Sequence, residues 1–187
     1  TGDNTAYAYT NDLSAENVQQ VAHSAAIAAK SDTHQAVMDF THAPKAIKSP
    51  IVKRPDTITF DDKVQLLKIA DQAARELNDA ISQVSVSYSD ICQNVTIANS
   101  LGTYVEDERI RTRLSCQAIA RKEDQIQTGF ASYGATTGFE LFETESPDAI
   151  GKEAAQRAMT LLNAKPCPAG KMPVVMAAEA GGTMVHE

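Results

Sequence analysis

The sequence predicts an α+β fold, in which an antiparallel or mixed β-sheet, arranged as a meander, packs against about three α-helices. Three observations lead to this prediction. Apolar residues recur at helical spacing towards both ends of the chain, the middle of the chain alternates with a period of two, and polar turn residues separate the alternating runs.

Three segments are predicted to be helical. Ser14 caps a helix that reaches about Lys30, and Thr59 begins a second helix, with Asp62 as its capping partner. Ser146, followed by a proline and an acidic residue, begins the third. The apolar faces are Val18, Val21, Ala22, Ala25 and Ala29 in the first, Val64, Leu67, Ala70, Ala74, Leu77 and Ile81 in the second, and Ile150, Ala154, Ala158 and Leu161 in the third.

The middle of the chain alternates with the period of a β-strand, and its clearest run extends from residue 109 to residue 120. One face of this run is expected to pack against a core and the other to face water. The packed face holds Ile110, Thr112, Leu114, Cys116, Ala118 and Ala120, and the polar face holds Arg109, Arg111, Arg113, Ser115 and Gln117.

Two turns and two neighbouring strands complete the meander. Alternation around Val84 predicts the preceding strand, and residues 99–102 form a turn in which Gly102 is free to adopt a positive φ. Polar residues 121–124 make a second turn, and the return strand begins near Ile126. A further short strand is expected at residues 7–10.

Residues 31–56 show no sustained period and contain three prolines, so they are predicted to form a long connection. So long a loop is often functional. His34 and His42 lie within it and could share a metal, although solvated loop histidines are the commoner case. His23, inside the first predicted helix, has no partner histidine at helical spacing.

The composition indicates a globular protein and excludes two classes of function. Hydrophobic residues make up 43% of the 187 residues and charged residues 22%, which is ordinary for a globular domain. The net charge of -7 argues against a general electrostatic grip on nucleic acid, and no apolar stretch is long enough to span a bilayer. Neither direct nucleic-acid binding nor a membrane partner is therefore expected.

The three cysteines, Cys92, Cys116 and Cys167, are scattered along the chain and form no Cys-x-x-Cys pair. They fit a reducing compartment, and therefore a cytoplasmic location, better than a disulfide framework. Cys116 is expected to face a core, and Cys167, which stands between two prolines, to lie in a loop.

The arginine row at Arg109, Arg111 and Arg113 admits two interpretations. The guanidinium groups on one strand face could hold a phosphate or a carboxylate, because their forked donors fit such anions. The acidic residues at positions 106–108 could equally neutralise them, which would make the row a solvated strand face.

The C-terminal stretch carries the candidate catalytic chemistry. An apolar run at Val174–Ala178 predicts a short buried strand, residues 181–182 are glycines that interrupt it, and Thr183 is placed to cap a helix. His186 and Glu187 would lie in the first turn of that helix. A His-Glu pair opens the helix of many zinc peptidase sites, in which the imidazole binds the metal and the carboxylate activates a water molecule. Taken alone, such a pair is more commonly just the polar start of a helix.

Several segments form one pattern through their order along the chain. They are Thr5–Ser14 before an Ala-rich helix, Asp61–Lys63, Leu66–Leu67 and Ala73–Arg75 in the second helix, Asn99–Thr103 before the long strand, Ala154–Ala155 in the late helix, and Pro168–Val175 leading into Gly182–Glu187. In this order they resemble the TldD/PmbA family, known both as modulators of DNA gyrase and as zinc metallopeptidases. The resemblance covers nearly the whole chain.

The chain looks like the TldD side of this family, because PmbA-type paralogues lack the His-Glu pair. In TldD-like proteins the motif continues after three residues with a second histidine, and a cysteine far downstream is expected to complete the site. The resemblance implies that His186 is the first zinc ligand and Glu187 the general base, with the other ligands outside this sequence. Histidines five residues apart on a regular helix would diverge by roughly 140°, so a bulge or local unwinding would be needed to aim both at one metal.

The resemblance also implies a domain organisation. Residues 1–170 would form an N-terminal α+β domain, incomplete at its N-terminus, and residues 171–187 would begin a truncated catalytic domain. The parent protein would be a zinc-dependent metallopeptidase that hydrolyses flexible or unfolded peptides, together with a PmbA-like paralogue or a second copy of itself.

The 187 residues themselves are expected to be a supporting, substrate-channel domain that is inactive alone. They are not expected to bind Zn²⁺ tightly, because one histidine cannot complete a coordination sphere. The alternative hypothesis is a non-enzymatic interaction or regulatory module, which would bind a partner through its sheet edge or its long connection.

Overall fold

A computed structural model of the chain describes residues 5–29, 41–42 and 50–187. The chain divides into two compact units, one formed by residues 1–45 and 96–106 and the other by residues 46–95 and 107–187. The predicted boundary between residues 170 and 171 is not tested by this division and stays a prediction.

The first unit contains helix α1 (Ala15–Ala28) and strand β1 (Thr41–His42). The predicted cap is confirmed, since the hydroxyl of Ser14 accepts a hydrogen bond from the backbone N–H of Asn17 at 3.4 Å. Strand β1 runs parallel to the part of β3 that belongs to this unit, with Thr41 beside Thr103.

The turn at residues 99–102 also belongs to this unit, and its predicted geometry is confirmed. Gly102 has a φ of 82°, and its N–H donates to the carbonyl of Asn99 at 3.2 Å. The side-chain oxygen of Asn99 accepts from the backbone N–H groups of Leu101 and Thr103, so one asparagine holds the turn from both sides.

Two predictions near the N-terminus have different outcomes. The strand expected at residues 7–10 is wrong, because these residues have no regular secondary structure and Tyr7 and Tyr9 are exposed. An extended run needs a partner strand to satisfy its backbone groups, and none lies beside it in the described part of the chain. Most of the predicted connection at 31–56, including His34, lies outside the described residues.

The second unit is built on three long strands, β2 (Ile81–Ala98), β3 (Thr103–Lys122) and β4 (Gln125–Ala135), of which β2 and β3 extend into the first unit. Strand β3 is central, with β2 on one side and β4 antiparallel on the other. The predicted α+β class and meander are therefore confirmed. Between β3 and β4 the polar turn is tight, and Glu123 adopts a φ of 54° within it.

The alternation of β3 is confirmed residue by residue. The predicted packing side chains, from Ile110 to Ala120, are all 1% exposed or less. Thr112 is the one polar member of this face, and its hydroxyl donates to the carbonyl of Thr137 at 2.9 Å. The predicted water-facing arginines are exposed.

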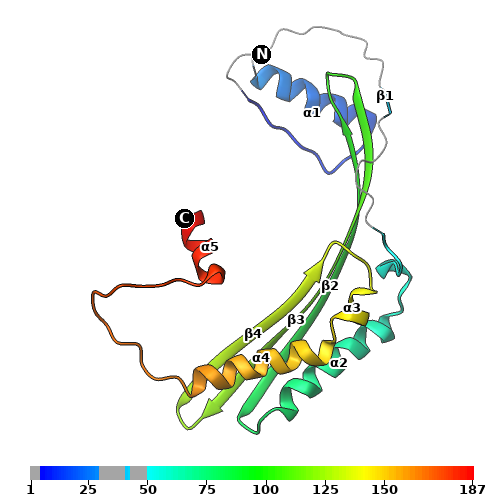
Figure 1. Ribbon diagram of the computed structural model, residues 1–187. Helices are drawn as coiled ribbons and strands as arrows, with labels where there is room; N and C mark the ends of the chain where they lie inside the picture. Colours follow the sequence, from blue (N-terminus) through cyan, green and yellow to red (C-terminus); the bar gives the residue numbers. More distant parts are fainter. Residues whose placement is uncertain (1–4, 30–40, 43–49) are drawn as a thin grey trace. The chain divides into compact units, whose positions relative to one another are not determined.

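Helices α2 (Phe60–Glu76) and α4 (Pro147–Leu162) lie side by side on one face of the sheet (Figure 1), and α4 contacts both α2 and β4. Both predicted helix starts are confirmed. Thr59 accepts from the backbone N–H of Asp62 at 3.2 Å, and Pro147 occupies the first turn of α4. A short 3₁₀-helix (Pro55–Thr57) and a single helical turn, α3 (Leu141–Thr144), complete this unit.

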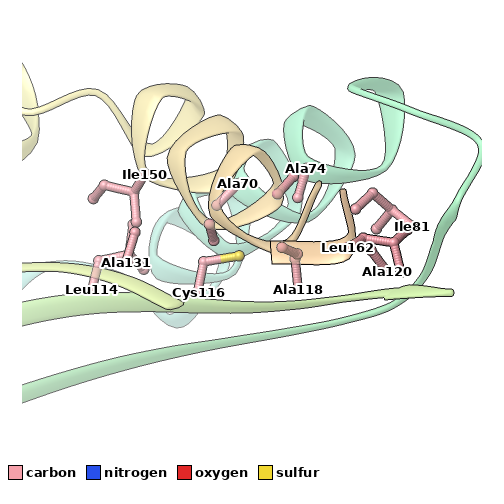
Figure 2. Close-up of a cluster of buried hydrophobic side chains, with 13 residues drawn as sticks. Ala70, Ala74, Ile81, Leu114, Cys116, Ala118, Ala120, Ala131, Ile150 and Leu162 are labelled. Atoms are coloured by element: carbon pink, nitrogen blue, oxygen red, sulfur yellow. The ribbon is translucent and has the colours of Figure 1, made fainter. Parts of the chain in front are cut away.

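The core lies between these two helices and the sheet (Figure 2). Many of its residues are small, because alanine makes up most of the contribution of both helices and half of that of β3. The fully packed positions are Ala70 and Ala74 from α2, Ile150, Ala154, Ala155, Ala158 and Leu162 from α4, and Leu114, Cys116, Ala118, Ala120 and Ala131 from the strands, with Ile81 at the start of β2.

Two glycines set how closely α4 approaches its neighbours. A Cβ atom on Gly151 would lie 2.1 Å from the carbonyl oxygen of Ala70 in α2, and one on Gly129 would lie 2.0 Å from the carbonyl oxygen of Ala154 in α4. Both obstacles are backbone atoms, which cannot move aside as a flexible side chain would. Glycine is therefore required at both positions for the helices and sheet to pack at this distance.

The predicted buried face of α4 needs one correction. Leu161 is 48% exposed, whereas Leu162 is 6% exposed and belongs to the core. Because α4 packs against α2 as well as β4, its buried surface is wider than a single stripe and is rotated towards Gly151 and Ala155.

An aromatic group packs against this core through Tyr88 and Phe142. The rings of Tyr88, Phe139 and Phe142 lie with centroids 5.4–6.2 Å apart. The ammonium group of Lys63 lies 5.4 Å from the centre of the Tyr88 ring and 2.6 Å from a carboxylate oxygen of Asp90. Burial raises the pKa of the Tyr88 hydroxyl, and the nearby carboxylate of Asp90 raises it further.

No helix in the described ranges is long and apolar enough to cross a membrane.

We predict that Gly151→Ala destabilises the protein by about 1–3 kcal/mol, because the new methyl group would force α4 away from the backbone of Ala70. Gly170→Ala is the matched control: its Cβ would lie 3.8 Å from the nearest atom, an ordinary contact, and its effect should stay within about 0.5 kcal/mol. Urea unfolding of both variants measures the difference. Equal stability of the two variants would show that α4 does not approach α2 as closely as described.

Candidate functional site

The predicted catalytic pair lies at the end of helix α5 (Ala178–His186). His186 is in the last turn of this helix, and Glu187 follows it, with its backbone N–H donating to the carbonyl of Thr183 at 3.3 Å. The prediction that Thr183 begins the helix, and that the pair lies in its first turn, is therefore wrong.

The glycine pair does not interrupt the helix, contrary to the prediction. The backbone N–H of Gly181 donates to the carbonyl of Ala177 at 2.8 Å, so the helical ladder continues through it. Glycine in a helix interior costs roughly 1 kcal/mol relative to alanine, which weakens a helix without preventing it. The strand predicted at Val174–Ala178 is also wrong, because Val174 and Val175 are 73% and 100% exposed and lack regular structure.

His186 and Glu187 are both exposed. Consecutive residues on a helix point about 100° apart, so the imidazole and the carboxylate are directed to different sides. One could bind a metal while the other contacts a water molecule or a substrate beside it.

A zinc site needs three or four ligands. Among the residues that the structure describes, no group of three or more His, Cys, Asp or Glu side chains lies close enough to hold a metal ion. His23 is exposed on α1, and the side chain of His42 in β1 lies outside the described atoms. The described residues alone therefore do not fit a zinc ion, and His186 offers a single ligand.

The cysteines lie as predicted. Cys116 is buried in the core, whereas Cys92 and Cys167 are exposed, and all three are free thiols. Burial raises the pKa of the Cys116 thiol to about 11, and the carboxylate of Asp71 adds to this effect. A thiol with so high a pKa carries almost no thiolate at neutral pH and is a poor nucleophile or metal ligand.

The arginine row divides into two parts. Arg109 donates to the carboxylate of Asp107 at 3.1 Å, so this member is neutralised as one of the two interpretations expected. Arg111 and Arg113 have no carboxylate within ion-pair distance in the described structure, and the guanidinium of Arg113 donates instead to the hydroxyl of Ser132 on β4 at 3.2 Å. These two arginines line a hollow on the sheet surface.

Sequence reasoning missed a carboxylate that joins two distant segments. Glu140 accepts hydrogen bonds from the backbone N–H groups of Val52, Lys53 and Gly138 at 2.8–3.1 Å, and from the hydroxyl of Thr137 at 2.8 Å. The Thr-x-x-Glu spacing of 137–140, which resembles a capping box, was the available signal. The long-range donors at 52–53 leave no local pattern.

Arg54 makes a second link of this kind that the sequence did not reveal. Its guanidinium donates to both carboxylate oxygens of Glu108 at 2.8–2.9 Å and to Asp56 at 2.9–3.1 Å. These hydrogen bonds raise the pKa of Arg54 and lower that of Asp56. The acidic residue at 108 is thus occupied by Arg54.

Comparison with known proteins assigns a family to the region that contains Arg54 and Glu140. Residues 53–162 match the family model described as the PmbA/TldA metallopeptidase central domain. A metalloprotease of Methanothermobacter thermautotrophicus is 32% identical over 133 residues, which are 71% of this chain and 29% of that protein. A metalloprotease TldD homolog of Haemophilus influenzae is 28% identical over 198 residues, which cover 100% of this chain and 40% of that protein.

Among solved structures, a proposed modulator of a DNA gyrase from Thermotoga maritima matches with a TM-score of 0.64 and 25% sequence identity, over 91% of this chain and 38% of that chain. The chain thus spans two fifths or less of the length of each of these relatives.

We predict that Glu140 contributes pH-dependent stability. Burial raises the pKa of its carboxyl, but the N–H donors of Lys53, Val52 and neighbouring groups outweigh burial and lower the pKa to about 2. Because the folded-state pKa lies below the unfolded value of about 4.3, this stability is present above about pH 4.3 and is lost as the pH falls towards 2.

Glu140→Gln should cost about 1–3 kcal/mol at pH 7, since an amide cannot accept from all four donors. The difference from wild type, measured by urea unfolding at several pH values, should shrink between pH 4.3 and pH 2. Glu76→Gln, an exposed change on α2, controls for the general loss of a carboxylate. A difference that stayed constant with pH would contradict the assigned protonation behaviour.

We predict that an aromatic disulfide that reacts with thiols will modify two thiols per folded chain rapidly at pH 8, because Cys92 and Cys167 are exposed. The third should react only after denaturant is added, since Cys116 is buried and its pKa is raised. Cys116→Ala should leave the number of rapid thiols at two. Three rapid thiols in the folded wild-type protein would mean that the core around Cys116 is open.

Proposed function

This chain belongs to the PmbA/TldD family of metallopeptidases, and from that premise we propose that it is part of a zinc-dependent enzyme that hydrolyses flexible or unfolded peptides. The observation that carries the proposal is the match of residues 53–162 to the central domain of this family, followed by the His-Glu pair of α5. Relatives named metalloproteases support it.

We assign His186 as one ligand of the metal and Glu187 as the general base. The remaining ligands would come from residues outside these 187, which is consistent with a chain that spans 29–40% of its relatives. When bound, zinc supplies Lewis acidity towards a water molecule and a peptide carbonyl. In the complete site the carboxylate of Glu187 would accept a proton from the attacking water and would later pass it to the leaving amine.

The role of the domain formed by residues 53–162 is to support that site and to border the path of the substrate. Its core is confined to one face of the sheet, where α2 and α4 pack, and the other face exposes mostly polar side chains together with Ile126 and Phe130. A rigid sheet with one uncovered face suits the guidance of an extended peptide. We infer that the complete enzyme works with a PmbA-like paralogue or with a second copy of itself.

A non-enzymatic interaction module is the second candidate. The observation that favours it is the same exposed sheet face, together with the relative described as a proposed modulator of a DNA gyrase. In this case His186 and Glu187 would serve no catalytic purpose.

The two candidates are separated by variants of the full-length protein. Glu187→Gln should lower kcat/KM for an unstructured peptide by about 10²–10⁴-fold while zinc content, measured by elemental analysis, stays unchanged. His186→Ala should reduce both zinc content and cleavage, because it removes a ligand.

Glu76→Gln, which removes an exposed carboxylate of α2, is the control and should change neither quantity. If Glu187→Gln retained wild-type cleavage, the role assigned to Glu187 would be wrong.

A further inference from the structure

The face of the sheet opposite α2 and α4 has its own chemistry. Arg111 and Arg113 alternate along β3 with the buried side chains that pack under the helices, so both lie on this outer face, and both are exposed. Their Cα atoms are about 6.6 Å apart, which is two residues of an extended strand. Two like charges held this close make a local positive potential on a chain whose net charge is -7.

The structure leaves both guanidinium groups available to a ligand. Within the described residues neither lies within 4.0 Å of a carboxylate oxygen, whereas the neighbouring arginines Arg54 and Arg109 are both paired with carboxylates. In the described structure the hydroxyl of Ser132, which accepts from Arg113, is the one side-chain partner of these two guanidinium groups. A guanidinium has five donors, so one neutral acceptor leaves most of its hydrogen-bonding capacity unused.

The position of this contact matters, because Ser132 belongs to the next strand. The guanidinium of Arg113 therefore reaches from β3 to β4. The residue directly opposite Arg113 in the register is Gly134, which has no side chain to stand between the guanidinium and the far edge of β4. Arg111, Arg113, Ser132, Gly134 and Thr136 together line one hollow at this place.

That far edge of β4 is open. In the described sheet β4 pairs with β3 and with no other strand. The carbonyl of Phe130 accepts from the side chain of Arg157 at 2.8 Å, so the backbone groups of residue 130 point away from β3. Since these directions alternate along an antiparallel strand, residues 132 and 134 also direct their N–H and C=O groups to the open edge.

We propose that this corner of the sheet binds an extended acidic peptide segment, which pairs with the edge of β4 near residues 132–134 and places carboxylates on Arg111 and Arg113. An added strand would lie about 4.8 Å from β4, and the guanidinium of Arg113 already reaches Ser132 on β4. Carboxylates at alternate peptide positions would be about 6.6 Å apart, which matches the spacing of the two arginines. Charged hydrogen bonds select the acidic side chains, and backbone pairing selects an extended conformation.

The proposal goes beyond the peptidase activity and does not rest on it, because binding is measured without turnover. The probe is a fluorescein-labelled decapeptide of alternating glutamate and threonine, titrated with the 187-residue chain and followed by fluorescence anisotropy at low salt. We expect saturable binding. A peptide with glutamine in place of glutamate should bind at least tenfold more weakly, and so should a glutamate peptide with N-methylated backbone amides.

The matched variants distinguish binding at this site from attraction by the overall charge of the protein. Arg111→Gln/Arg113→Gln should weaken binding of the glutamate peptide at least tenfold, whereas Lys68→Gln/Arg75→Gln removes the same charge from exposed positions on α2 and should change affinity less than twofold. Arg113→Lys should lose part of the affinity, because an ammonium group cannot form the forked contact. Circular dichroism checks that each variant is folded.

Three results would overturn the proposal. The first is equal weakening by both double variants, which would indicate bulk electrostatics. The second is equal affinity for the glutamate and glutamine peptides. The third is a pair of observations: inorganic phosphate displaces the peptide when its concentration equals that of the peptide carboxylates, and N-methylation does not weaken peptide binding. Together these would indicate a simple anion site without strand pairing.

Discussion

The close approach of α4 to α2 and β4 is the constraint on which the rest of the second unit depends. It is possible only because Gly151 and Gly129 present no side chain to the backbones they meet, and because alanine fills most of the remaining contact. Small residues bury little apolar area each, so their stabilisation depends on dense packing over the whole interface. The consequence is a core that tolerates little change in side-chain volume.

This packing also determines where function can lie. Both helices cover the same face of the sheet, so β3 buries one set of alternate side chains completely and leaves the other set in solvent. The links made by Glu140 and Arg54 hold the chain that enters α2 to the segment before α3 and to strand β3. The outer face is thereby presented on a rigid element, which suits recognition of an extended ligand, while the His-Glu pair lies on a separate short helix.

Much of this fold could be predicted from sequence, because its signals are local. The period of two in β3, the caps at Ser14 and Thr59, and the proline at the start of α4 each act within a few residues. Predictions failed where the structure of a segment depends on a packing or pairing partner that is distant in the sequence or absent. The apolar run at 174–178 has no partner strand within the part of the chain that the structure describes, and Leu162 rather than Leu161 is buried because α4 packs against two neighbours.

The candidate site was predictable only in part. The pair His186 and Glu187 was recognised from its residue types and its context, but its position at the end of α5 was not, because two glycines weaken a helix without ending it. Of the arginine row, sequence alone left open whether acidic neighbours neutralise it. The structure shows that Asp107 forms an ion pair with Arg109 and that Glu108 forms one with Arg54. Among the described residues, neither carboxylate pairs with Arg111 or Arg113.

The most direct test of the account is the metal content of the full-length protein, measured together with its cleavage of an unstructured peptide in the presence and absence of a chelator. A zinc peptidase should contain about one zinc ion per active site, lose its cleavage activity when the chelator is added, and recover that activity when zinc is restored. A folded protein that binds no zinc and cleaves nothing, alone and with a PmbA-like paralogue, would contradict this expectation and would leave the interaction module as the better explanation.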